Sequence, residues 1–122
     1  MSEKEKIVYI ATHGAEDPER ASLPFVLATA AQAMEVEAVV ALQGTAVFLA
    51  KKGCFEHVFA AGLPALRDLV HNFLSEGGKL LVCVPCIRER KIEESDLIDG
   101  AKPTAAAALT QEILTANATL VY

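Results

Sequence analysis

The chain has 122 residues, of which 52% are apolar and 22% charged, and its formal net charge at pH 7 is −5. This length corresponds to one domain, residues 1–122, with enough apolar side chains for a complete core, and the negative charge without a basic block argues against a nucleic-acid partner. Residues 1–6 are charged and lack the apolar stretch of a signal peptide, and no apolar run is long enough to span a membrane, so we expect a cytoplasmic protein.

The first elements alternate between apolar runs and a helical pattern. Residues 7–11 and 38–42 are short, continuous apolar runs, which predict strands buried on both faces. Between them, Ser22 is a good N-cap, and Pro24 suits a first helical turn because its missing N–H costs little there. We therefore expect a helix from about Ser22 to about Met34.

The middle of the chain contains two further helical patterns. Gly44 and Thr45 open a short helix that Thr45 caps and Gly53 terminates. Residues 58–60 form either a short strand or an extended link. A longer helix is predicted over residues 64–76, where apolar residues recur at helical spacing before a pair of glycines.

The last third contains the clearest strand, residues 80–84. A polar loop is expected from there to about Lys102, followed by an Ala-rich helix that starts at Pro103, and residues 119–122 form a final strand. Strands and helices thus alternate along the chain. This order predicts an α/β fold with a mostly parallel sheet of four to five strands and helices on both faces.

Ligands of such folds bind beyond the carboxyl ends of the strands. Three loops meet that description: residues 12–17, 43–45 and 85–90. We therefore expect His13 and Cys86 on the same rim of the sheet, with Gly44 and Thr45 as further rim residues.

Cys83 and Cys86 have the spacing of a redox dithiol, of half a zinc site, or of two unrelated cysteines. Residues three apart in an extended strand are roughly 10 Å apart, whereas a disulfide needs Cα atoms within about 7 Å. A bridge would therefore require a sharp turn at Pro85. Cys86 alone is the stronger candidate for a reactive thiol, because nearby positive charge, here from Arg88 and Arg90, favours the thiolate.

The other candidate ligands and bases form no recognisable group. A structural zinc site usually needs two close pairs of ligands, and the remaining candidates are scattered along the chain: His13, Cys54, His57 and His71. No glycine-rich phosphate loop is present either. We therefore expect no metal and no cofactor, and we interpret His13 either as an acid/base or substrate contact or as a side chain bonded to the loop backbone.

Four segments in this order resemble the DsrE/DsrF-like (DsrEFH-type) sulfur-relay family. They are residues 12–21, 42–49, 77–92 and 96–100. The likeness covers nearly the whole chain. Cys83 is additional to the single cysteine of the family pattern.

The resemblance implies a three-layer α/β/α fold that assembles as a homotrimer or homohexamer. It also implies a sulfurtransferase-like carrier, in which Cys86 holds sulfur as a persulfide and passes it between protein donor and acceptor thiols. Arg88 and Arg90 would stabilise the sulfur anion, and His13 would assist. Two alternatives stay open: a dithiol redox protein that uses Cys83 and Cys86, and a non-catalytic oligomeric ligand-binding module.

Overall fold

The computed structural model describes residues 4–122, and residues 1–3 of the charged N-terminal segment, in which no signal peptide is expected, lie outside the described chain. The elements in chain order are β1 (Lys6–Ala11), α1 (Pro18–Ala33), β2 (Glu37–Leu42), η1 (Gly44–Ala50), η2 (Phe55–His57), α2 (Leu66–Ser75), β3 (Lys79–Cys83), α3 (Val84–Glu89), η3 (Glu94–Asp96), β4 (Ala101–Thr104), α4 (Ala106–Leu114) and β5 (Ala118–Val121). Among these residues, no helix is both long and apolar enough to cross a bilayer.

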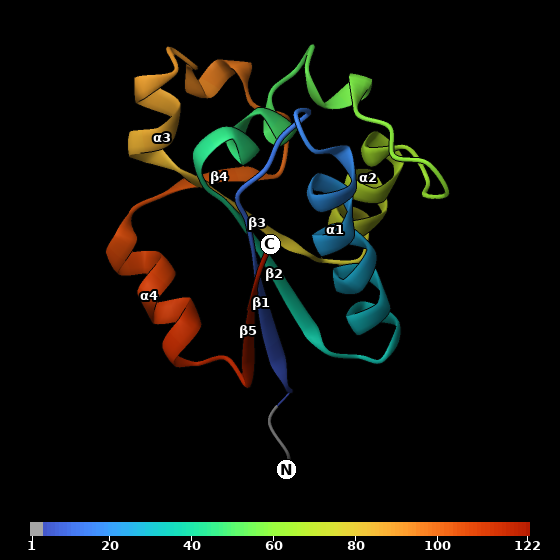
Figure 1. Cartoon of the computed structure of the whole chain (residues 1–122). Coiled ribbons are helices and arrows are strands. Elements are labelled where there is room, and N and C mark those ends of the chain that lie inside the picture. Colours follow the sequence, from blue (N-terminus) through green and yellow to red (C-terminus); the bar gives the residue numbers. More distant parts are fainter. Residues whose placement is uncertain (1–3) are drawn as a thin grey trace.

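The strands form one five-stranded sheet in the order β4-β3-β2-β1-β5, and every neighbouring pair is parallel. Helices α1 and α2 cover one face of the sheet and α4 covers the other, while α3 and η1 lie at the end where the strands finish (Figure 1). The expected α/β fold with a parallel sheet between helical layers is confirmed.

After a charged first residue, the central strands β1, β2 and β3 are apolar to their ends, as expected for a sheet that is buried on both faces. In β1, Tyr9 and Ala11 belong to the core that includes α1 and α2, whereas Val8 and Ile10 belong to the core under α4. The first core is the larger one. Its two largest fully buried side chains, Phe25 of α1 and Phe73 of α2, meet edge to face with ring centroids 5.6 Å apart.

Helix α1 begins four residues earlier than predicted. Asp17 is its N-cap and accepts a hydrogen bond from the backbone N–H of Arg20 at 3.1 Å, and Pro18 occupies the first helical position. The Ser22 hydroxyl, expected to cap the helix, is buried and donates to the Pro18 carbonyl at 2.7 Å. Pro24 therefore lies inside the helix, where it is tolerated although it removes one backbone donor.

The segment after β2 also differs from the prediction. It is a 3₁₀ helix that ends at Ala50, before Gly53, and Thr45 does not cap it. The Thr45 hydroxyl instead donates to the Glu16 carboxylate at 2.8 Å, so it ties two loops together. Residues 58–60 form a connecting segment without strand structure.

The region expected to be a polar loop after residue 84 contains α3, η3 and β4. Pro103 and Thr104, predicted to start the last helix, instead lie in β4, and α4 begins at Ala106. Strand β4 is at the edge of the sheet, with Pro103 opposite Val82, and an edge strand tolerates a proline that cannot donate to the ladder.

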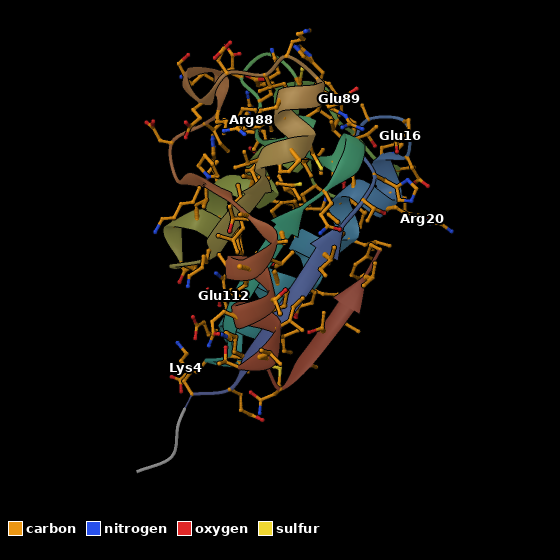
Figure 2. All side chains as sticks on the ribbon, turned by 90° about the vertical axis from the view of Figure 1, so that its left-hand side faces the viewer. Lys4, Glu16, Arg20, Arg88, Glu89 and Glu112 are labelled. Atoms are coloured by element: carbon orange, nitrogen blue, oxygen red, sulfur yellow. The ribbon has the colours of Figure 1, made fainter. Side chains whose placement is uncertain are left out.

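Glu112, labelled on α4 in Figure 2, links that helix to the first residues of two strands, Lys6 of β1 and Lys79 of β3. Its carboxylate accepts hydrogen bonds from the ammonium groups of Lys6 at 2.9 Å and Lys79 at 2.7 Å. Partial burial alone would raise the pKa of Glu112, but the hydrogen bonds from Lys79 and Lys6 outweigh it and hold the pKa below its usual value.

We expect Glu112→Gln to lower the free energy of unfolding by about 1 kcal/mol near neutral pH. A carboxyl whose pKa is depressed in the folded state stabilises the fold above its unfolded pKa, and this contribution is lost as the pH falls through the folded value. The difference between wild type and variant should therefore vanish in urea titrations at strongly acidic pH. The control Glu94→Gln, at an exposed position, should change stability little at either pH; a gap for Glu112→Gln that persists in acid would contradict the assignment.

Candidate functional site

The junction between β3 and α3 brings the two expected cysteines together. The strand ends at Cys83 and the helix begins at the next residue, so Cys83 is the N-cap and Cys86 lies in the first turn. Their Sγ atoms are 2.7 Å apart. The sharp turn at Pro85 that a bridge would require is present, because Pro85 sits in the first turn of α3, where its fixed φ favours helix. Residues 83–86 therefore do not follow the extended path that would place them roughly 10 Å apart.

Cys86 is held from two sides. The backbone N–H of Gly44, at the start of η1, points to the Cys86 sulfur at 3.3 Å. Gly44 has φ of +57°, a left-handed conformation that glycine adopts at low cost. The Arg90 guanidinium donates to the Cys86 carbonyl at 3.2 Å, so it fixes the turn rather than binding the sulfur. The thiol itself is half-buried.

The surroundings of Cys83 favour its neutral form. Burial raises the pKa of the Cys83 thiol, and its contact with the Cys86 thiol raises the pKa further. The Cys86 backbone and the Arg90 charge act in the opposite direction but do not cancel this rise. Cys83 is therefore more strongly held as a neutral thiol at neutral pH than an ordinary cysteine.

Glu16 links the first loop to the loop that carries Gly44. One carboxylate oxygen accepts from the Gly14 N–H at 2.7 Å and from the Thr45 hydroxyl at 2.8 Å, and the other lies 3.0 Å from Nδ1 of His13. Partial burial would raise the pKa of Glu16, but hydrogen bonds from Gly14, Thr45 and His13 lower it overall. Glu16 is therefore ionised, and its hydrogen bond from Thr45 positions the residue next to Gly44.

The sequence-based candidates lie at the same end of the sheet but do not all reach the thiol. His13 connects to Cys86 only indirectly, through Glu16 and the Thr45–Gly44 segment. Arg88 is exposed on α3, at the same end of the molecule as Glu89 and Glu16 (Figure 2). Arg88 lines a cavity of about 330 Å³ together with Val84, Ile87, Ile92, Glu93, Glu94, Ser95 and Pro103.

Glu16 is the rim residue that sequence reasoning missed. Its signal was its position three residues after His13 in the first loop, a spacing at which two side chains can meet within one turn. The remaining ligand candidates lie elsewhere: Cys54 precedes η2, and the His71 ring packs edge-on against Phe55 with centroids 5.6 Å apart. Within residues 4–122, no three His, Cys, Asp or Glu side chains are grouped as metal ligands.

The sequence of this chain is similar to those of known proteins. Residues 5–122 match the sequence model of the DsrE/DsrF-like family. Two proteins of Methanocaldococcus jannaschii are each 32% identical: uncharacterized protein MJ0760 over 79% of this chain and 35% of its own length, and uncharacterized protein MJ0989 over 80% of this chain and 82% of its own length. The chain therefore spans about a third of the first of these relatives.

Two solved structures have the same fold. The ychN protein from E. coli superimposes with a TM-score of 0.76 at 19% identity, covering 97% of this chain and 99% of its own. MTH1491, a protein of unknown function from Methanobacterium thermoautotrophicum, also gives a TM-score of 0.76, at 13% identity, covering 98% of this chain and 100% of its own. At these identities the likeness concerns the arrangement of strands and helices.

Proposed function

The chain belongs to the DsrE/DsrF-like family, and from this premise we propose that it is a cytoplasmic sulfur-relay protein in which Cys86 carries persulfide sulfur between protein thiols. The observation that carries the proposal is the placement of the Cys86 thiol. It lies half-buried at the carboxyl ends of the strands, and the Gly44 N–H is directed at its sulfur. This backbone donor holds the sulfur in a fixed position where a partner's sulfur atom can reach it.

The relay needs two exchange steps that balance without any cofactor. The Cys86 thiolate attacks the outer sulfur of a donor persulfide, a new sulfur–sulfur bond forms at Cys86, and the donor leaves as a thiolate. An acceptor thiolate then attacks the outer sulfur of the Cys86 persulfide, and the Cys86 thiolate is the leaving group. Each step exchanges one sulfur–sulfur bond for another, so no external oxidant is required.

A sulfur-loading assay tests this proposal. The Cys83→Ser protein, which keeps Cys86 as the one thiol of the pair, is incubated with glutathione persulfide and analysed by mass spectrometry after alkylation. We expect a gain of one sulfur atom on the peptide that contains Cys86, and complete loss of that gain when Cys86→Ser is added. Cys54→Ser is the matched control and should load normally. A gain that survives Cys86→Ser would refute the assignment.

A dithiol redox function is the second candidate, favoured by the 2.7 Å contact between the Cys83 and Cys86 sulfur atoms. It differs from the relay in its co-reactant, because the two thiols would be oxidised by a partner disulfide rather than loaded by a persulfide. The raised pKa of Cys83 is compatible with both, since only one thiol of such a pair needs to be the nucleophile.

The proposed partners are protein sulfur donors and acceptors and further copies of this chain in a homotrimer or homohexamer. Self-association is supported by large apolar side chains exposed on α4 and on the edge strand β5: Leu114 at 74%, Leu120 at 41% and Val121 at 68%. An edge strand without a partner on one side, together with exposed apolar side chains nearby, offers groups that contacts between subunits could cover. Neither a nucleic acid nor a membrane is among the proposed partners.

A further inference from the structure

We propose that Cys83 discharges the persulfide on Cys86, releasing hydrosulfide and leaving a Cys83–Cys86 disulfide. This inference rests on the proposed sulfur loading of Cys86 and adds a second outcome to it. When no acceptor thiol arrives, the protein itself reduces the stored sulfur. The activity is that of a single-turnover persulfide reductase with the chain's own second thiol as the reductant.

The geometry favours attack at the inner sulfur of the persulfide. The Cys83 sulfur lies 2.7 Å from the Cys86 sulfur, which becomes the inner atom once a sulfur is added to it. Attack on the outer atom would only move the persulfide from one cysteine to the other. The disulfide that follows inner attack needs an S–S distance of about 2.05 Å, which is shorter than the present separation of 2.7 Å.

The step balances in atoms and charge. The Cys83 thiolate forms a bond to the Cys86 sulfur, and the bond between that sulfur and the outer sulfur breaks. The electron pair leaves with the outer sulfur, which departs as hydrosulfide and keeps the persulfide proton. The outer sulfur is reduced and the Cys83 sulfur is oxidised. A small thiol or a dithiol protein must then reduce the disulfide, at two thiol equivalents per cycle, before the chain can accept sulfur again.

The setting of Cys83 makes the discharge slow at neutral pH. Its titration is governed by burial and by the two groups beside it, the Cys86 thiol and the Arg90 guanidinium, and the net result is a raised pKa. The attacking Cys83 must be a thiolate while the persulfide keeps its proton, so the reactive form carries a single proton, and release should fall at alkaline pH once both groups are deprotonated. A loaded chain at neutral pH would then hold its sulfur long enough to meet an acceptor.

The test uses full-length protein loaded with glutathione persulfide and freed of excess reagent. Free sulfide is measured over time, and the protein mass is measured before and after. We expect the wild type to release one sulfide per bound persulfide and to end two hydrogen atoms lighter than the reduced protein. Cys83→Ser should keep its extra sulfur and release no sulfide, Cys83→Ala should do the same, and Cys54→Ser should behave as wild type.

Two failures are distinguishable. A loaded wild-type protein that neither releases sulfide nor forms the disulfide would overturn the discharge step but leave sulfur carriage intact. Release of sulfide from both Cys83 variants at the wild-type rate would have the same consequence. Cys83 variants that take up no sulfur would overturn the proposed loading of Cys86, and the discharge with it. A wild-type rate that keeps rising at alkaline pH, where both groups are deprotonated, would contradict departure of the outer sulfur as hydrosulfide.

Discussion

Phe73→Ala is expected to lower the free energy of unfolding by about 3 to 5 kcal/mol. Phe73 is fully buried in α2, and its ring meets the Phe25 ring edge to face. The ring also fills the space beside Gly78, where a Cβ atom would come within 2.4 Å of it. Gly78 has no side chain that could move into the void, so the variant loses both burial and the aromatic contact.

Urea denaturation followed by circular dichroism measures this loss, since the chain has no tryptophan to report by fluorescence. Phe59→Ala removes the same ring from a site that is 65% exposed and should change stability by no more than about 0.5 kcal/mol. Equal losses for the two variants would mean that the α1–α2 core is not the main source of stability.

The sheet could be predicted because its central strands carry a pattern that burial imposes. Residues of β1, β2 and β3 are apolar on both faces, and short, continuous apolar runs that alternate with helical segments are typical of strands in a buried parallel sheet. The predicted strand starts and ends therefore agree with the structure within about two residues.

Strand β4 could not be predicted because it lies at an edge. Lys102 and Pro103 are exposed there, and one side of the strand has no partner strand, so no apolar pattern is required. Pro103 and Thr104 were instead predicted to begin the last helix, because proline is common at the first position of a helix.

The short distance between the Cys83 and Cys86 sulfur atoms also could not be predicted from the sequence. The spacing of the two cysteines is compatible with either an extended or a helical path for residues 83–86. An extended path places the sulfur atoms far apart, whereas a helical turn brings them together. The choice depends on where the strand ends, and its last pairs with β2 and β4, Leu42 with Val82 and Cys83 with Thr104, are contacts between distant parts of the chain. The identity of Cys86 as the candidate thiol could be inferred; the proximity of Cys83 could not.

Gly14→Ala is expected to slow sulfur loading of Cys86 by about tenfold to a hundredfold and to lower stability by about 1 to 3 kcal/mol. A Cβ atom at residue 14 would lie 2.7 Å from the backbone oxygen of Thr45, and a backbone atom cannot rotate away as a side chain can. The loop must shift, and it carries the Gly44 N–H that is directed at the Cys86 sulfur. Loading is measured in the Cys83→Ser background, well below the unfolding temperature.

Gly78→Ala is the matched control because it introduces the same methyl group into an equally crowded place, 2.4 Å from the Phe73 ring. Gly78 precedes the amino end of β3, whereas Cys83 lies at the carboxyl end, so the strain arises away from the thiol. This variant should lose stability but load sulfur at the wild-type rate while folded. If both glycine variants load equally fast, the contact between the first loop and Thr45 does not position Gly44. If only Gly14→Ala is slow, the chain of contacts from Gly14 through Thr45 to Gly44 sets the reactivity of Cys86.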